Sequence, residues 1–164
     1  MQAAGLLMED GKRELIDGEI IDLPSESDSH MSLRVALNRS LILQIADDLR
    51  VASRGTLRLS ETDWPEPDFY VRQASTRPGD IHGADVLLVI EISDTTLAHD
   101  LGGKADLYRR HGVCEYWVID VNARRLHVHR ADGAWPSPAV PLTDIIEPAL
   151  IPGLRLRIAD FLPD

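Results

Sequence analysis

Two acidic residues occupy predicted strand ends, where their carboxylates could bind a metal ion. Asp68 directly follows Pro67 at the start of a short predicted strand, and Glu91 ends a run of five apolar residues. Carboxylates at the ends of two neighbouring strands can bind Mg²⁺ through their oxygens and leave positions for water and a phosphate oxygen. Such a cation holds an attacking water and neutralises charge on a leaving group. Asp68 and Glu91 are therefore candidate metal ligands.

A lysine follows these two residues in the sequence and could assist the same reaction. Lys104 lies thirteen residues after Glu91, on the helix predicted to follow the Glu91 strand. A lysine near a metal-bound water can orient that water or stabilise negative charge on phosphorus. Asp100 lies four residues before Lys104, so both side chains project from one helical face.

Each of these residues, taken alone, has a structural alternative. Asp68 could be a turn carboxylate, Glu91 a sheet-end acid paired with an arginine, and Lys104 a surface lysine paired with Asp100. Their spacing by itself does not prove that the three side chains converge, so at this point the structural alternatives stay open beside a shared site.

The hydrophobic pattern indicates which elements position this site. Val86–Ile90 is an unbroken apolar run, which predicts a central strand buried on both faces. A helix over residues 97–111, ended by Gly112, leads to a second buried strand at Tyr116–Ile119. This strand–helix–strand unit indicates an α/β protein, with the direction of strand pairing left open.

Further elements flank this unit. Apolar residues recur every fourth position in a helix predicted from His30 to Leu49. A turn at Gly18 precedes a strand at Glu19–Leu23, and short strands at Thr56–Ser60 and Phe69–Val71 could form a hairpin. An edge strand is expected at 154–158.

One later strand carries two histidines. Leu126 and Val128 alternate with His127 and His129, which predicts a half-exposed strand. The two histidines invite a metal site, but without a third ligand a solvated strand face is favoured.

Length and composition fit one globular domain over residues 1–164, since the chain is 44% hydrophobic and 27% charged. Cys114 is the only cysteine, which excludes an internal disulfide and suits a reducing cytosol. No apolar stretch approaches the roughly 18 residues of a membrane span, and the N-terminus lacks the pattern of a signal peptide. We expect a cytoplasmic protein with no membrane partner.

Charge argues against nonspecific binding to nucleic acid. The formal net charge is −10, whereas affinity for phosphate backbones comes mostly from Lys and Arg. A locally basic groove or a bound divalent cation could offset this balance. Five arginines lie close in sequence and form either a phosphate track or, more commonly, a solvated face: Arg34, Arg39, Arg50, Arg54 and Arg58.

The motifs resemble a known nuclease family. Pro67-Asp68 and Glu91-Ile92-Ser93 resemble the PD-(D/E)XK nuclease motif. The resemblance to the Uma2-like (DUF820) restriction endonuclease family is closer and spans about residues 13 to 158. It rests on Val89–Ser93, Asp100, Lys104, Tyr108, Gly112-Val113, Glu115–Trp117, Glu14–Glu19 and His30.

The resemblance implies a restriction-endonuclease-like core, a central mixed sheet flanked by helices, and DNA cleavage that depends on Mg²⁺ or Mn²⁺ and leaves a 5′-phosphate. Because the three residues occur in the order of the family, the resemblance implies one catalytic site formed by Asp68, Glu91 and Lys104. The metal ligands would be Asp68, Glu91 and the Ile92 carbonyl. The superfamily lysine would stand at position 93, where this chain has Ser93, so the resemblance places it on the following helix as Lys104.

The resemblance also suggests further site residues and an assembly. Glu14 and His30 would lie near the site, although a surface charge and a solvent-facing histidine are the alternatives. Asp100 would be ancillary. A homodimer is expected by the same analogy. The alternative function is an inactive nuclease-fold module that acts in dimerisation or regulatory binding, which the acidic charge favours.

Overall fold

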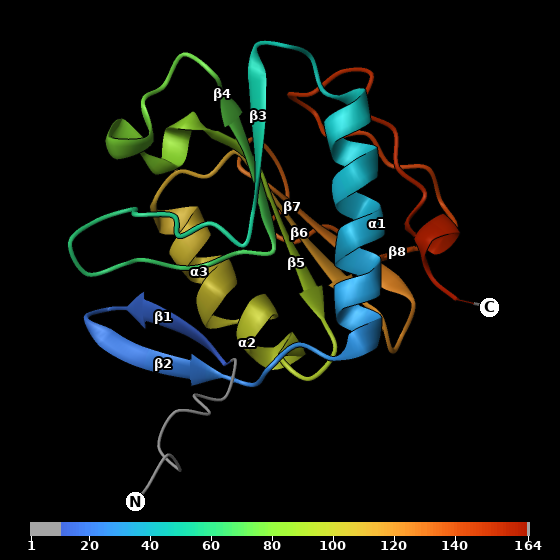
Figure 1. Cartoon of the computed structure of the whole chain (residues 1–164), viewed down its shortest axis with the longest axis horizontal. Helices are drawn as coiled ribbons and strands as arrows, with labels where there is room; N and C mark the ends of the chain where they lie inside the picture. Colours follow the sequence, from blue (N-terminus) through green and yellow to red (C-terminus); the bar gives the residue numbers. More distant parts are fainter. Residues whose placement is uncertain (1–10, 164) are drawn as a thin grey trace, which may run out of the picture.

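The centre of the molecule is a six-stranded mixed sheet (Figure 1). In this computed structural model, which describes residues 11–163, the strand order is β3-β4-β5-β6-β7-β8. The strands β5 and β6 are parallel, and the other neighbouring pairs of this sheet are antiparallel. The bounds are β3 Leu49–Ser53, β4 Phe69–Gln73, β5 Val86–Ser93, β6 Glu115–Asp120, β7 Arg125–Arg130 and β8 Val140–Pro141. The predicted α/β class with a mixed sheet is confirmed.

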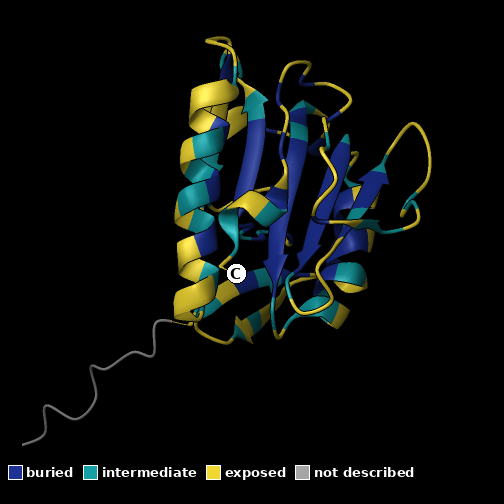
Figure 2. Ribbon diagram, turned by 90° about the vertical axis from the view of Figure 1, so that its right-hand side faces the viewer, coloured by how far each residue is buried: buried dark blue, intermediate teal, exposed yellow. Residues whose placement is uncertain are grey.

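Helices cover both faces of the sheet (Figure 1). On one face lies α1 (Asp28–Gln44), which buries Leu33, Leu37 and Leu41 in the larger core cluster. On the other face lie α2 (Leu97–Leu101) and α3 (Gly103–Arg110). The central strands are buried along most of their length because both faces are covered (Figure 2). None of the helices within residues 11–163 is long and apolar enough to cross a membrane.

A separate hairpin lies beside α2 and α3 (Figure 1). Its strands β1 (Lys12–Ile16) and β2 (Glu19–Leu23) are antiparallel and joined by Asp17 and Gly18, which both have positive φ. Leu15 of β1 exchanges main-chain hydrogen bonds with Trp64 of the loop before β4, at 3.3 and 2.7 Å. The hairpin is thereby fixed against the loop that leads to Asp68.

The helix predicted over residues 97–111 is broken at Gly102, which has φ −100° and ψ −103°. A Cβ on Gly102 would lie 2.7 Å from the carbonyl oxygen of Ala98, so the close approach requires glycine. The break starts a new helix at Gly103 and places Lys104 in its first turn.

The long helix ends earlier than predicted. It stops at Gln44, and Leu49 begins β3 instead of ending the helix. Leu49 is buried as a residue of β3. Its spacing from Leu41 fits the apolar pattern of the helix, although the helix has already ended.

The expected strand at Thr56–Ser60 is also wrong, because β3 is the partner of β4. Leu57 and Leu59 are buried as alternation predicted, but their N–H groups donate to the carbonyls of Pro65 and Asp63 within the same loop. Alternation therefore marked burial rather than membership of the sheet.

Two predictions near the C-terminus need correction. Residues 154–158 form no strand of the main sheet; Leu156 makes an isolated bridge with Ile146, and the edge strand is β8. His129 is buried rather than solvated, because Tyr116 and Trp135 pack against its ring. Short 3₁₀ turns occur at Pro78–Asp80, Gly83–Asp85 and Ile158–Phe161.

Candidate active site

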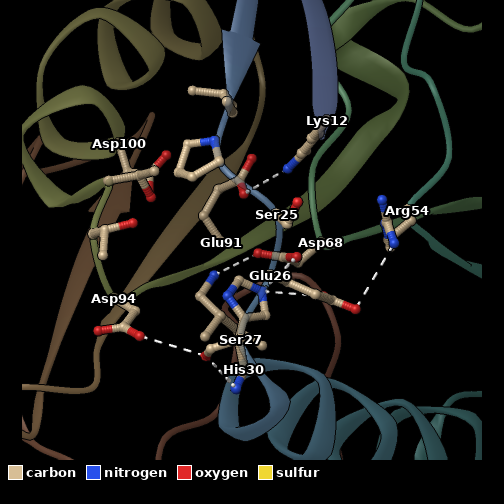
Figure 3. Close-up of a pocket in the computed structure, with 15 residues that line it drawn as sticks. Lys12, Ser25, Glu26, Ser27, His30, Arg54, Asp68, Glu91, Asp94 and Asp100 are labelled. Carbon is tan, nitrogen blue, oxygen red and sulfur yellow. Dashed lines mark hydrogen bonds and ion pairs between the residues drawn. The ribbon is translucent and has the colours of Figure 1, made fainter. Parts of the chain in front are cut away.

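A cavity of about 160 Å³ opens where β4 begins and β5 ends (Figure 3). Since one water needs roughly 10–15 Å³ by the same measure, the cavity has room for a hydrated cation or a phosphate group. Its walls come from β1, the segment before α1, α1 itself and the segment after β5. The ionisable residues that line it are Lys12, Glu26, His30, Arg54, Asp68, Glu91, Asp94 and Asp100.

Asp68 is buried on the residue before β4 and uses both carboxylate oxygens. His30 Nε2 donates to Oδ1 at 3.0 Å, and the Ile92 N–H donates to Oδ2 at 2.7 Å. Burial by itself would raise the pKa of Asp68, but the His30 hydrogen bond, the charges of Lys12 and His30, and the Ile92 N–H lower it to about 2. Asp68 is therefore ionised at neutral pH.

Glu91 is buried on β5 and lies between the two lysines of the chain. Lys104 Nζ donates to Glu91 Oε1, and Lys12 Nζ lies 3.6 Å from Oε2. Burial raises the pKa of Glu91 to about 8, with smaller contributions from Asp100 and Asp68, against the opposing charges of both lysines. Glu91 is thus the site carboxyl that holds a proton near neutrality.

Lys104 is fully enclosed behind Glu91. Its Nζ donates to Glu14 Oε1 at 2.6 Å as well as to Glu91, and it lies 5.6 Å from the centre of the Tyr108 ring. Burial would lower the pKa of Lys104, but Glu91 and Glu14 raise it. Burial would raise the pKa of Glu14, but neighbouring groups, with the charge of Lys104 first among them, lower it to about 2. Lys104 therefore keeps an anionic partner even when Glu91 is protonated.

His30 and Glu26 form the wall of the cavity opposite Glu91 (Figure 3). His30 lies in the first turn of α1, where its N–H donates to the capping hydroxyl of Ser27 at 3.1 Å. Ligand atoms of Glu26, His30 and Asp68 lie within 4.8 Å of one another. Glu26 already accepts two hydrogen bonds from Arg34, at 3.0 and 2.8 Å, so a cation there would compete with the guanidinium.

Asp100 does not pair with Lys104, contrary to the surface ion pair considered above. Its Oδ2 accepts from the hydroxyls of Ser93 and Thr96, the latter at 2.7 Å. These bonds tie α2 to the end of β5. Ser93, at the position of the superfamily lysine, therefore anchors Asp100.

The donor set suits a hard divalent cation. Asp68 and Glu91 offer carboxylate oxygens, and Ile92 lines the same cavity. In an extended strand the N–H and C=O of one residue point to the same side, so the Ile92 carbonyl faces the edge where its N–H meets Asp68. Oxygen ligands of this kind are those that Mg²⁺ prefers.

Sequence reasoning did not assign three charged residues of the cavity wall to the site: Lys12, Glu26 and Asp94. A signal for Lys12 was present, since it lies two residues before Glu14 in one strand and so projects from the same face. The five arginines form no single track. Arg54 lines the cavity, Arg34 pairs with Glu26, and Arg58 stacks on Trp64 at 4.3 Å.

Comparison with known families decides where the chain belongs. The model of the Uma2 family, described as "Putative restriction endonuclease", matches residues 4–159. The chain belongs to this family. As a Uma2 family member, it has the nuclease fold that the resemblance implied.

A solved structure shows the same fold. It is the crystal structure of "a putative nuclease belonging to DUF820" from Anabaena variabilis ATCC 29413, with a TM-score of 0.69 and 17% sequence identity. The match covers 91% of this chain and 88% of that chain. A search of curated proteins found no match. At this identity the likeness shows the fold, and the Uma2 match shows the family.

Proposed function

We propose that this Uma2 family member is a divalent-metal-dependent DNA endonuclease whose active site is built from Asp68, Glu91 and Lys104. The observation that carries the proposal is the cavity at the adjoining ends of β4 and β5, which is lined by the buried carboxylates of Asp68 and Glu91. The family match supports a nuclease, and this cavity supports metal dependence.

Mg²⁺ or Mn²⁺ would be held by Asp68, Glu91 and the main-chain carbonyl of Ile92. When bound, the cation would supply Lewis acidity toward a phosphate oxygen and lower the pKa of a bound water. The lining of the cavity contains more acidic than basic residues, and this excess of acidic groups favours a bound cation.

The residues around the ligands hold them in place. His30 fixes one oxygen of Asp68, and Lys104 with Tyr108 fixes Oε1 of Glu91. Asp100 is ancillary and secures the segment after β5. In the reaction a water oxygen forms a bond to phosphorus and the bond to the 3′ oxygen breaks. One proton ends on the 3′-hydroxyl and the other passes to solvent, which leaves a 5′-phosphate.

Plasmid cleavage tests this function. Wild type should nick or linearise supercoiled DNA with Mg²⁺ or Mn²⁺ and not with EDTA. Asp68→Asn and Glu91→Gln should lose roughly 10²-fold or more, by analogy with the loss of one stabilising group in other active sites. Asp106→Asn, which removes an exposed acid from α3, should cut as wild type does. Equal cutting by wild type and Glu91→Gln contradicts the proposal.

An inactive module for dimerisation or regulatory binding is separated from the enzyme by calorimetry. The net charge of −10 is the feature that favours it. The enzyme should release or absorb heat on titration with millimolar Mn²⁺, and Glu91→Gln should not. A silent titration of wild type, together with no cleavage, would assign the module.

We also propose a homodimer that uses the outer face of α1. Val35 and Ile42 are 60% and 55% exposed, and they lie seven residues apart on one face of the helix. Cleavage of both DNA strands by one small enzyme needs two active sites, which a dimer supplies. Light scattering should give a dimer for wild type and a monomer for Val35→Glu/Ile42→Glu; a wild-type monomer would refute this assembly.

A further inference from the structure

The chain has two lysines, and both converge on the same two carboxylates. Lys12 comes from β1 and Lys104 from α3, yet the Nζ of each lies within 4 Å of both Glu14 and Glu91. The other basic residues of the chain are arginines and histidines. Lysine carries a compact ammonium group, which differs in shape and hydration from the guanidinium of arginine. Both of the chain's lysine ammonium groups therefore lie at this one place, and the surroundings of each indicate its role.

The two lysines approach Glu91 from different directions. Lys104 contacts Oε1 with a side chain that is 0% exposed, and it does not line the cavity. Lys12 approaches Oε2 with a side chain that is 15% exposed, and it lines the cavity together with Asp68 (Figure 3). A molecule in the cavity would therefore meet Lys12, whereas Glu91 separates it from Lys104.

The lysines also differ in how far their N–H donors are engaged. Lys104 makes two short hydrogen bonds to carboxylates. The contacts of Lys12 are ion pairs of 3.6 and 3.8 Å, longer than hydrogen bonds. Within residues 11–163 its ammonium donates no hydrogen bond, so it is held at the cavity wall with its donors available to a ligand.

We propose that Lys12 is a catalytic residue whose ammonium donates to a non-bridging oxygen of the reacting phosphate. Lys104 is then a positioning residue that holds Glu91 from behind. This inference rests on the proposed nuclease function and changes which lysine touches the substrate. Lys12 stabilises the charge that builds on the phosphate oxygens as water attacks, in the way that preorganised donors do elsewhere.

Lys12→Met is the central test, because it removes the charge and keeps an apolar stem. The expected result is a fall in kcat of about 10²-fold or more with little change in thermal stability. Lys12→Arg should restore part of the rate. Arg13→Met is the matched control, since Arg13 is the exposed neighbour on the same strand, points to the opposite face and pairs with Asp22. It should cleave as wild type.

Two readouts besides cleavage rate separate contact with substrate from a structural role. Lys12→Met should keep the calorimetric heat of Mn²⁺ binding, because it removes no metal ligand. In protein made with lysine that carries ¹³C at Cε, a short non-cleavable phosphorothioate oligonucleotide should shift the Lys12 signal and leave that of the enclosed Lys104 in place.

The outcomes distinguish this inference from the proposed function. If wild type neither cleaves DNA nor binds Mn²⁺, the nuclease proposal fails. If wild type cleaves and Lys12→Met cleaves equally fast, the nuclease stands and the role of Lys12 is refuted. A Lys12→Met variant that loses both cleavage and Mn²⁺ binding would also refute it, since Lys12 would then organise the carboxylates.

Discussion

Glu91 should make the metal-free protein less stable as the pH rises. Its carboxyl is buried, and its pKa is raised from 4.5 to about 8 in the fold. A carboxyl of this kind contributes stability that is fully present below pH 4.5 and is lost as the pH rises to about 8. Glu91→Gln removes this titration while keeping a neutral polar group of similar shape.

The size of the effect follows from the shift. Between pH 4.5 and pH 7 the unfolded chain releases the proton that folded Glu91 retains, which costs wild type about 3 kcal/mol at 1.36 kcal/mol per pH unit. Glu91→Gln does not incur this cost. The unfolding free energy of Glu91→Gln relative to wild type should therefore rise by about 3 kcal/mol over this range.

Urea unfolding in EDTA at pH 5, 6, 7 and 8 measures the difference. Asp68→Asn is the matched control, because the pKa of Asp68 is lowered from 3.8 to about 2. Both states of Asp68 are ionised above pH 5, so this variant should be less stable by a constant amount of about 2 kcal/mol. Saturating Mg²⁺ should stabilise wild type and neither variant.

Two results would refute the reasoning about Glu91. A difference that stays constant between pH 5 and 8 would mean that Glu91 does not titrate there. A Glu91→Gln variant that is less stable than wild type by a constant amount, as Asp68→Asn is expected to be, would mean that Glu91 is ionised in the fold and that its ion pair with Lys104 stabilises the protein.

Further predictions concern the elements that carry the site. Gly102→Ala should destabilise the protein by about 1–3 kcal/mol in urea unfolding, because the new Cβ would meet a carbonyl oxygen at 2.7 Å. Gly103→Ala has open space and should be neutral or slightly stabilising; equal costs for the two would contradict the steric argument. Ser27→Ala should cost about 1 kcal/mol by removing the cap of α1. Ser32→Ala, at an exposed helical position, is its control, and an equally small effect from both would argue against the cap.

Features that depend on residues adjacent in the sequence could be predicted from it. The unbroken apolar runs in β5 and β6 predicted strands buried on both faces, since burial of a strand depends on its own side chains. The resemblance supplied the family and the candidate ligands Asp68 and Glu91. The end of α1 was missed, because a buried leucine gives the same apolar pattern whether it lies in a helix or in a strand. The break at Gly102 was also missed.

The sequence by itself determined the α/β class, because the burial of a strand depends on its own side chains. Its motifs resembled the Uma2 family, and that resemblance implied the mixed sheet and the two carboxylates at the strand ends. Tertiary structure alone decided where the two lysines lie. Lys12 and Lys104 lie far apart in the chain, and only packing of the β1–β2 hairpin beside α3 brings both to Glu91. Packing also encloses Lys104 and leaves Lys12 at the cavity, since burial of a charged side chain depends on partners distant in sequence.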